Sequence, residues 1–178
     1  MEYQGIINLI ADDEAKPVGD NSESIEPLPS TADEIHPFGQ YCLDSHNSIG
    51  MHIHPNLTII IDGEQFEIPE NSGIYTDICP NAMHITHTHD NSGKLHVENY
   101  TKEDVPLEVF FDVWGKHFDE TGIFEYRGGV IEMTVNGTIS QDYQNHSLED
   151  KQTIVIVYTS AQGEDDPSKY NAAVFVLT

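Results

Sequence analysis

The chain has 178 residues, and 31 acidic residues against 7 basic ones give it a formal net charge of -24. That length suits one domain with a terminal arm, large enough to bury a core without extra cross-links. A surface this acidic repels phosphate backbones and anionic lipids, which argues against nucleic-acid partners and against a role at a membrane surface.

The start of the chain, most clearly residues 11–35, is rich in Asp, Glu, Ser and Pro. This composition predicts an acidic, partly irregular arm over residues 1–35, followed by a single domain over residues 36–178. The first three residues lack the basic start of a secretion signal, and no stretch is long enough to cross a bilayer. The chain is therefore either cytosolic or, as we prefer, an exported protein whose native signal is absent from this sequence.

Two tight hairpins are predicted from turns that contain glycine. Asp62-Gly63 separates the β-branched run 57–61 from residues 65–68, and Asn136-Gly137 follows the run 130–135. Both dipeptides tolerate the positive φ angles that a type I′ turn requires. Two later apolar runs, residues 153–158 and 172–177, predict buried strands.

One helix is predicted over residues 106–118. Pro106 suits a first helical turn, and one face of the helix would carry four apolar side chains, namely Leu107, Phe110, Phe111 and Trp114. The elements together predict a mainly β fold, an antiparallel and sandwich-like single domain with one packed α-helix.

Two short stretches carry histidines at alternate positions. His52 and His54 form the first pair, and His87 and His89 form the second. Residues two apart in a strand point to the same face, so each pair would project its imidazoles together. Two such strands side by side would bring four imidazoles within a few ångströms of one another.

Further candidates flank these pairs. His84 lies just upstream of the second pair, and His96 shares one face of a short strand with Glu98. We expect Asp90 and Glu98 to orient a ligating ring through a hydrogen bond, or to act as an additional ligand.

A metal ion is the simplest explanation of the clustered histidines. Protonated rings would repel one another, and neutral buried rings would each need hydrogen-bond partners. Zinc is held by imidazole nitrogens in a tetrahedral shell, and copper(II) binds the same nitrogens more tightly. The expected cofactor is therefore zinc or copper. The expected ligands are His52, His54, His84, His87, His89 and His96.

The other histidines are interpreted differently. His36, His117 and His146 stand alone in the sequence and are expected to be structural, whereas His46 is an intermediate case.

The two cysteines, Cys42 and Cys79, permit one disulfide, whose formation depends on the compartment. Four glycosylation sequons are compatible with an exported glycoprotein. They begin at Asn56, Asn99, Asn136 and Asn145.

Several of these motifs together resemble a little-characterised family of exported, His-rich archaeal and bacterial domains. The resemblance runs from about Ile49 to Tyr158. Its motifs are Met51-His52-Ile53-His54, Asp62-Gly63, His87-Thr88-His89-Asp90 with Gly93, His96 and Glu98, the stretch Phe110 to Gly115, and Val135-Asn136-Gly137. It implies an extracytoplasmic location and a functional role for His52, His54, His87, His89 and His96.

Better-known metal sites match less well. A cupin site expects a Glu a few residues after its HxH pair, and residues 55–62 contain none. A blue-copper site would use Cys79, His84 and His89, and it requires Cys79 to be a free thiolate.

Three functions remain open at this point. The first is extracytoplasmic metal binding for scavenging, chaperoning or delivery, with an envelope protein or a second copy of the chain as a possible partner. The second is a zinc-dependent hydrolase or hydratase that uses a metal-bound water. The third is an envelope-associated interaction domain in which the ion only holds strands together.

Overall fold

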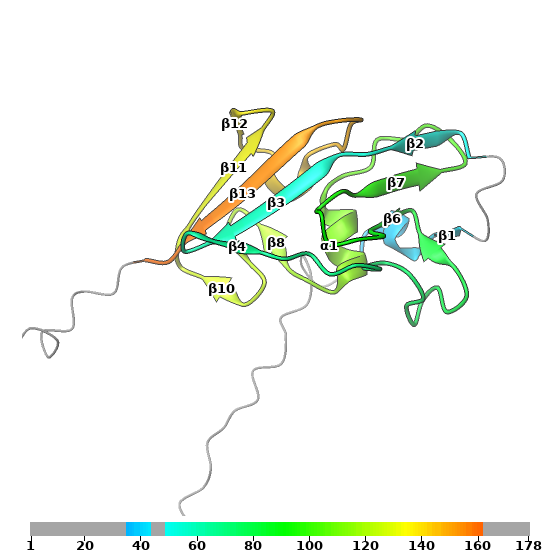
Figure 1. The fold of residues 1–178 in the computed structure, drawn as a ribbon, viewed down its shortest axis with the longest axis horizontal. Coiled ribbons are helices and arrows are strands. Elements are labelled where there is room, and N and C mark those ends of the chain that lie inside the picture. The colour runs from blue at the N-terminus through cyan, green and yellow to red at the C-terminus, as the bar shows by residue number, and fades with distance from the viewer. Residues whose placement is uncertain (1–34, 44–48, 162–178) are drawn as a thin grey trace, which may run out of the picture.

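The structure, a computed structural model, describes residues 35–43 and 49–161. Its largest sheet has five strands in the order β12 (Thr138–Ser140), β11 (Val130–Val135), β13 (Thr153–Thr159), β3 (Asn56–Ile61) and β4 (Glu64–Phe66). This sheet runs diagonally across the molecule in Figure 1. The mainly β class predicted from the sequence is confirmed.

Both predicted hairpins belong to this sheet. β3 and β4 pair antiparallel around Asp62 and Gly63, whose φ angles are 50° and 86°. β11 and β12 pair antiparallel around Asn136 and Gly137, with φ angles of 52° and 78°. Each turn therefore adopts the left-handed backbone that its residue types predicted.

The centre of the sheet contains a parallel pair, which the predicted antiparallel arrangement did not include. β13 runs parallel to β3, from Thr153 opposite Asn56 to Tyr158 opposite Ile61. Alternate residues of both strands are buried, among them Ile59, Ile154 and Ile156 at 0% exposure. Burial of these side chains in the core explains why the two segments pair although they are far apart in sequence.

Three smaller sheets complete the fold. The first has the order β2 (Met51–Ile53), β7 (His96–Asn99) and β6 (Thr86–His87). The second has the order β10 (Tyr126–Arg127), β9 (Gly122–Ile123) and β8 (Phe118–Asp119). The third pairs β1 (Cys42–Leu43) with β5 (Met83–His84), and the 3-10 turns η1 (Pro37–Gln40) and η2 (Tyr143–Asn145) lie in the connections.

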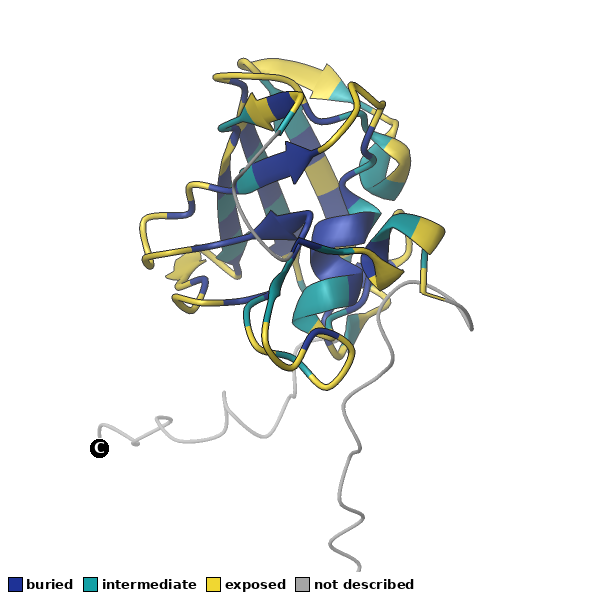
Figure 2. Ribbon diagram, turned by 90° about the vertical axis from the view of Figure 1, so that its right-hand side faces the viewer, coloured by how far each residue is buried: buried dark blue, intermediate teal, exposed yellow. Residues whose placement is uncertain are grey.

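The helix α1 (Glu108–Trp114) is shorter than predicted. Gly115, with a φ of 71°, ends it in the left-handed conformation typical of a helix C-terminus. At the other end, Pro106 forms an isolated bridge with Ser147 instead of starting the helix. The helix contacts β6, β8 and η1, and Phe110 and Phe111 are fully buried. Figure 2 shows this buried centre in dark blue, surrounded by exposed turns.

The main sheet and the sheet β2–β7–β6 are connected directly. Only two residues, His54 and Pro55, separate β2 from β3. Gly93 holds a second connection, because Leu57 N–H donates a hydrogen bond of 2.8 Å to the Gly93 carbonyl. A Cβ at Gly93 would lie 2.2 Å from the Leu57 carbonyl oxygen, so only glycine fits this approach. The predicted strand over residues 172–177 and the arm, apart from Ile35, lie outside the described residues.

Candidate metal centre

The sheet β2–β7–β6 places the two HxH stretches on opposite sides of its central strand, β7. In the antiparallel register His52 lies opposite Glu98, and His87 lies opposite His96. Alternate residues of a strand share a face, so His96 and Glu98 project to the same side of β7. Val97, between them, is fully buried. The sheet thus presents histidines on one face and packs its other face into the core.

Four imidazole rings gather around that of His96. The ring centroids of His54 and His89 lie 4.6 Å and 4.5 Å from that of His96. Those of His87 and His52 lie 5.4 Å and 5.8 Å from it. Within the pairs the centroids are 4.5 Å apart for His52 and His54, and 4.8 Å apart for His87 and His89. Both HxH stretches therefore reach the same central ring.

Two groups of three histidines in the described part of the chain are suited to hold a metal ion. We call His52, His54 and His96 the first triad, and His87, His89 and His96 the second triad. In each triad the ligand atoms lie within 4.8 Å of one another. Nitrogens on one tetrahedral zinc lie about 3.4 Å apart, given bonds of about 2.1 Å, so small side-chain rotations would close either triad.

Burial differs between the members of the triads. His87 is fully buried, with 0% of its surface exposed, whereas His52 and His89 are exposed. His54 and His96 are half-buried. Each triad therefore contains one imidazole that solvent reaches freely.

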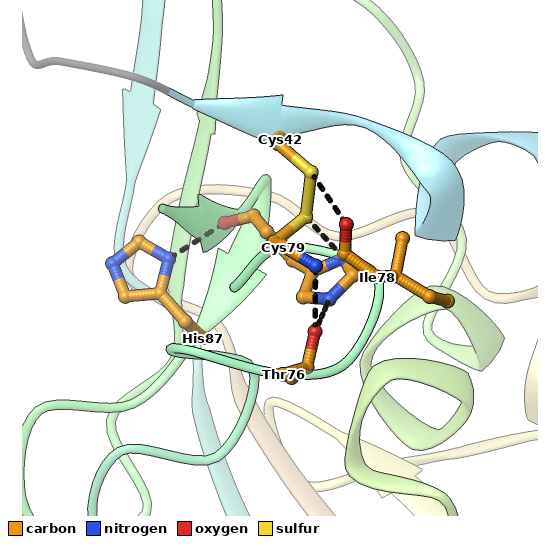
Figure 3. The surroundings of a disulfide bond; sticks show 6 residues. Cys42, Thr76, Ile78, Cys79 and His87 are labelled. Atoms are coloured by element: carbon orange, nitrogen blue, oxygen red, sulfur yellow. Dashed lines mark hydrogen bonds between the residues drawn. A yellow bond between two sulfur atoms is a disulfide. The ribbon is translucent and has the colours of Figure 1, made fainter. Parts of the chain in front are cut away.

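The buried candidate ligand His87 has a defined tautomer. Its Nδ1 lies 2.9 Å from the backbone carbonyl oxygen of His84, a contact drawn in Figure 3. A carbonyl oxygen can only accept, so Nδ1 carries the proton and donates it, and the lone pair is on Nε2. Hydrogen bonds of this kind commonly fix the orientation of metal-ligating histidines.

Glu98 contacts two members of the first triad. Its carboxylate is buried, with 1% of the side chain exposed, and its Oε1 lies 3.0 Å from Nε2 of His52. The same oxygen lies 3.9 Å from Nδ1 of His96. Because His96 belongs to both triads, Glu98 contacts both through this ring. This geometry fits the supporting position that the sequence predicted for Glu98 rather than that of a direct ligand.

The protonation of the cluster favours metal binding. Burial, together with the charges of His89, His54 and His52, lowers the pKa of His96 from 6.5 to about 4. Burial and the neighbouring His52 also lower the pKa of His54. Both rings are therefore neutral at pH 7, and each offers a lone pair to a cation.

His84 lies outside both triads, although the sequence placed it among the candidate ligands. Its Nε2 lies 2.6 Å from the hydroxyl of Thr76, and its Nδ1 lies 3.6 Å from Sγ of Cys79. Cys79 is bonded to Cys42, and these contacts surround the disulfide in Figure 3. His84 therefore lies next to the candidate site. Its ring contacts the disulfide, and its backbone carbonyl oxygen accepts the hydrogen bond from Nδ1 of His87.

The remaining candidate, Asp90, occupies the loop after the second HxH stretch. Its carboxylate accepts a hydrogen bond of 2.9 Å from the Ser92 backbone, and the hydrogen bonds from Ser92 lower its pKa. Asp90 is thus exposed and engaged in its own turn. His46 lies outside the described residues.

The isolated histidines contact groups outside the two triads. His36 accepts a hydrogen bond of 3.1 Å from Phe38 N–H, and Nε2 of His117 lies 3.1 Å from Asp119. Nε2 of His146 lies 3.2 Å from Oε1 of Gln152.

One supporting residue was missed by sequence reasoning. Asp150 accepts a hydrogen bond of 3.0 Å from the backbone N–H of His54, and Lys151 N–H donates to the His54 carbonyl. These contacts fix the backbone of His54 where β2 ends. Asp150 is 96 residues further along the chain and belongs to no recognisable motif, so no local signal could have identified it.

The donor set determines which chemistry is available. Three imidazoles suit zinc or copper(II) and leave a fourth coordination position open for water or another ligand. A blue-copper site is excluded, because the disulfide leaves Cys79 without a thiolate.

Comparison with known proteins adds no family to this description. No family model, curated protein or solved structure matches the chain. Within the described residues, no helix has the length and apolarity needed to cross a membrane. The functional inference therefore depends on the histidine cluster itself.

Proposed function

We propose that this protein binds a divalent transition-metal ion, zinc or copper, through its histidine triads. The observation that carries the proposal is the convergence of four imidazoles, from the ends of β2 and β6, around His96 on β7. Rings this close are stabilised when one cation accepts their lone pairs. Copper(II) is favoured by intrinsic affinity, and zinc by the tetrahedral geometry that three histidines and a water readily form.

Three features favour an extracytoplasmic role. The disulfide between Cys42 and Cys79 is typical of oxidising compartments. The four sequons and the resemblance to exported His-rich domains point the same way, so glycosylation and membership in that family are parts of the proposal. There the protein would scavenge a metal, hold it, or deliver it to an envelope partner or a second copy of the chain. Its acidic surface would raise the local concentration of cations at low salt.

The test is zinc binding by disulfide-intact protein that has been stripped with a chelator. Competition with a chromophoric chelator at pH 7.5 should give saturable binding. His96→Ala should reduce the affinity most, because His96 belongs to both triads. His117→Ala is the matched control, since it removes a buried imidazole that contacts Asp119 instead. Equal affinities for the two variants, or no binding by the unaltered chain with either zinc or copper, would contradict the proposal.

A zinc-dependent hydrolase or hydratase is the second candidate. It is favoured by the number of ligands, because three histidines leave room for a zinc-bound water with a pKa of about 7. Ester hydrolysis by the zinc-loaded protein should then vanish both on chelation and in His96→Ala. Zinc binding without ester hydrolysis would contradict the enzyme function and leave metal binding as the proposed function.

A further inference from the structure

The two triads are joined in an unusual way, because they share one ligand. His96 lies between the two HxH pairs. Its ring centroid is 4.6 Å from that of His54 on one side and 4.5 Å from that of His89 on the other. No group of four histidines in the described chain has all its ligand atoms within the 4.8 Å that defines each triad. The geometry therefore offers two ion positions of three histidines each, rather than one position with five.

A shared imidazole restricts how these positions are filled. A neutral imidazole carries a proton on one nitrogen and offers a single lone pair for coordination on the other. His96 can therefore coordinate one ion at a time, and filling both positions would require it to lose its second ring proton as well. We propose that the cluster is a two-position exchange site, in which one ion is held alternately by the first and the second triad. This inference rests on the proposed metal-binding function.

The transfer between positions needs only ligand exchange. The ion releases the nitrogens of His52 and His54 as it gains those of His87 and His89, while His96 serves both positions. Each lost metal–nitrogen bond is replaced by another, and no electron is transferred. Each triad also contains an exposed member, His52 or His89, so either position can accept an ion from solvent or surrender it.

The supporting contacts are divided in the same way. Glu98 orients His52 in the first triad with a contact of 3.0 Å, and the His84 carbonyl orients His87 in the second with a contact of 2.9 Å. Each HxH pair thus has its own group beside one candidate ligand, and Glu98 in addition lies 3.9 Å from the shared His96.

Two double variants test the proposal, with zinc as the probe. His87→Ala/His89→Ala leaves only the first triad complete, and His52→Ala/His54→Ala leaves only the second. For two mutually exclusive positions, the association constant of the unaltered chain equals the sum of the constants of the two variants. Each variant should therefore bind one zinc, and positions of equal strength would make each variant about twofold weaker than the unaltered chain.

Cobalt(II) adds a direct readout of the same model. Its visible spectrum reports the coordination shell, so the spectrum of the unaltered chain should be a weighted sum of the two variant spectra. One ion per unaltered chain, additive constants and additive spectra would support the proposal. Circular dichroism of both variants checks that the fold is retained.

The other outcomes overturn the exchange site and leave metal binding intact. Two ions per unaltered chain would show that both positions are filled together. If the zinc affinity of both variants fell by at least about 100-fold, more than the loss of a supporting group costs, the two triads would form one site that needs ligands from both HxH pairs. If only one variant lost zinc affinity, only the triad removed in that variant would bind the ion. If the unaltered chain bound no ion, the proposed function itself would fall.

Discussion

Acid should destabilise the metal-free protein through His96, and the size of this effect follows from its environment. Burial and neighbouring imidazoles lower the pKa of His96 from 6.5 to about 4. Between these values the unfolded chain binds a proton that the folded chain does not, so stability is present above pH 6.5 and is lost as the pH falls towards 4. From pH 7 to pH 4.5, this one group should remove about 2 kcal/mol from the free energy of unfolding.

The assay is urea unfolding of chelator-treated protein at several pH values between 7 and 4.5, with the disulfide intact. His96→Gln removes the titrating ring. Over this pH interval its free energy of unfolding should therefore fall by about 2 kcal/mol less than that of the unaltered chain. His146→Gln is the control, because it removes an imidazole that contacts Gln152 rather than the cluster. Superimposable pH dependences for the unaltered chain and His96→Gln would refute the reasoning.

Three further outcomes are expected. Reduction of the Cys42–Cys79 bond, which closes a loop spanning 37 positions, should lower the free energy of unfolding by about 4 kcal/mol in urea titrations. Phe111→Ala should cost about 3–5 kcal/mol in the same assay, because the ring is fully buried; a loss below 1 kcal/mol would contradict its place in the core. Glu98→Gln should weaken zinc binding about 10–100-fold in competition titrations, because Glu98 contacts rings of both triads; an unchanged affinity would remove its orienting role.

Features fixed by nearby residues could be predicted from the sequence. The Asp62-Gly63 and Asn136-Gly137 turns depend on the backbone preferences of two residues each, and both formed as expected. The helix was recognised from its apolar face. Its ends were less predictable, because the left-handed Gly115 stops it before Phe118. Strand β13 was also recognised, since its apolar run is continuous.

Long-range pairing could not be predicted in this way. The parallel register of β13 with β3 depends on which buried surfaces meet in the core, and neither strand alone encodes its partner. The same limit applies to Asp150, whose contact with His54 exists only in the folded chain.

The candidate site was partly predictable for the same reasons. The two-residue period of a strand placed His52 with His54, and His87 with His89, on common faces. The period could not show that His96 would lie between the pairs, because that depends on β7 becoming the central strand of its sheet. Nor could spacing separate His84 from its neighbours, because only the pairing of His84 with Cys42 turns it towards the disulfide.

The covalent loop divides the histidine cluster along the chain. His52 and His54 lie inside the segment closed by Cys42 and Cys79, whereas the second triad lies entirely beyond it. The second triad occupies one short stretch of sequence, so gathering its three rings on an ion costs little chain entropy. Its three rings come together once β6 pairs with β7, whereas the first triad also requires β2 to return to β7.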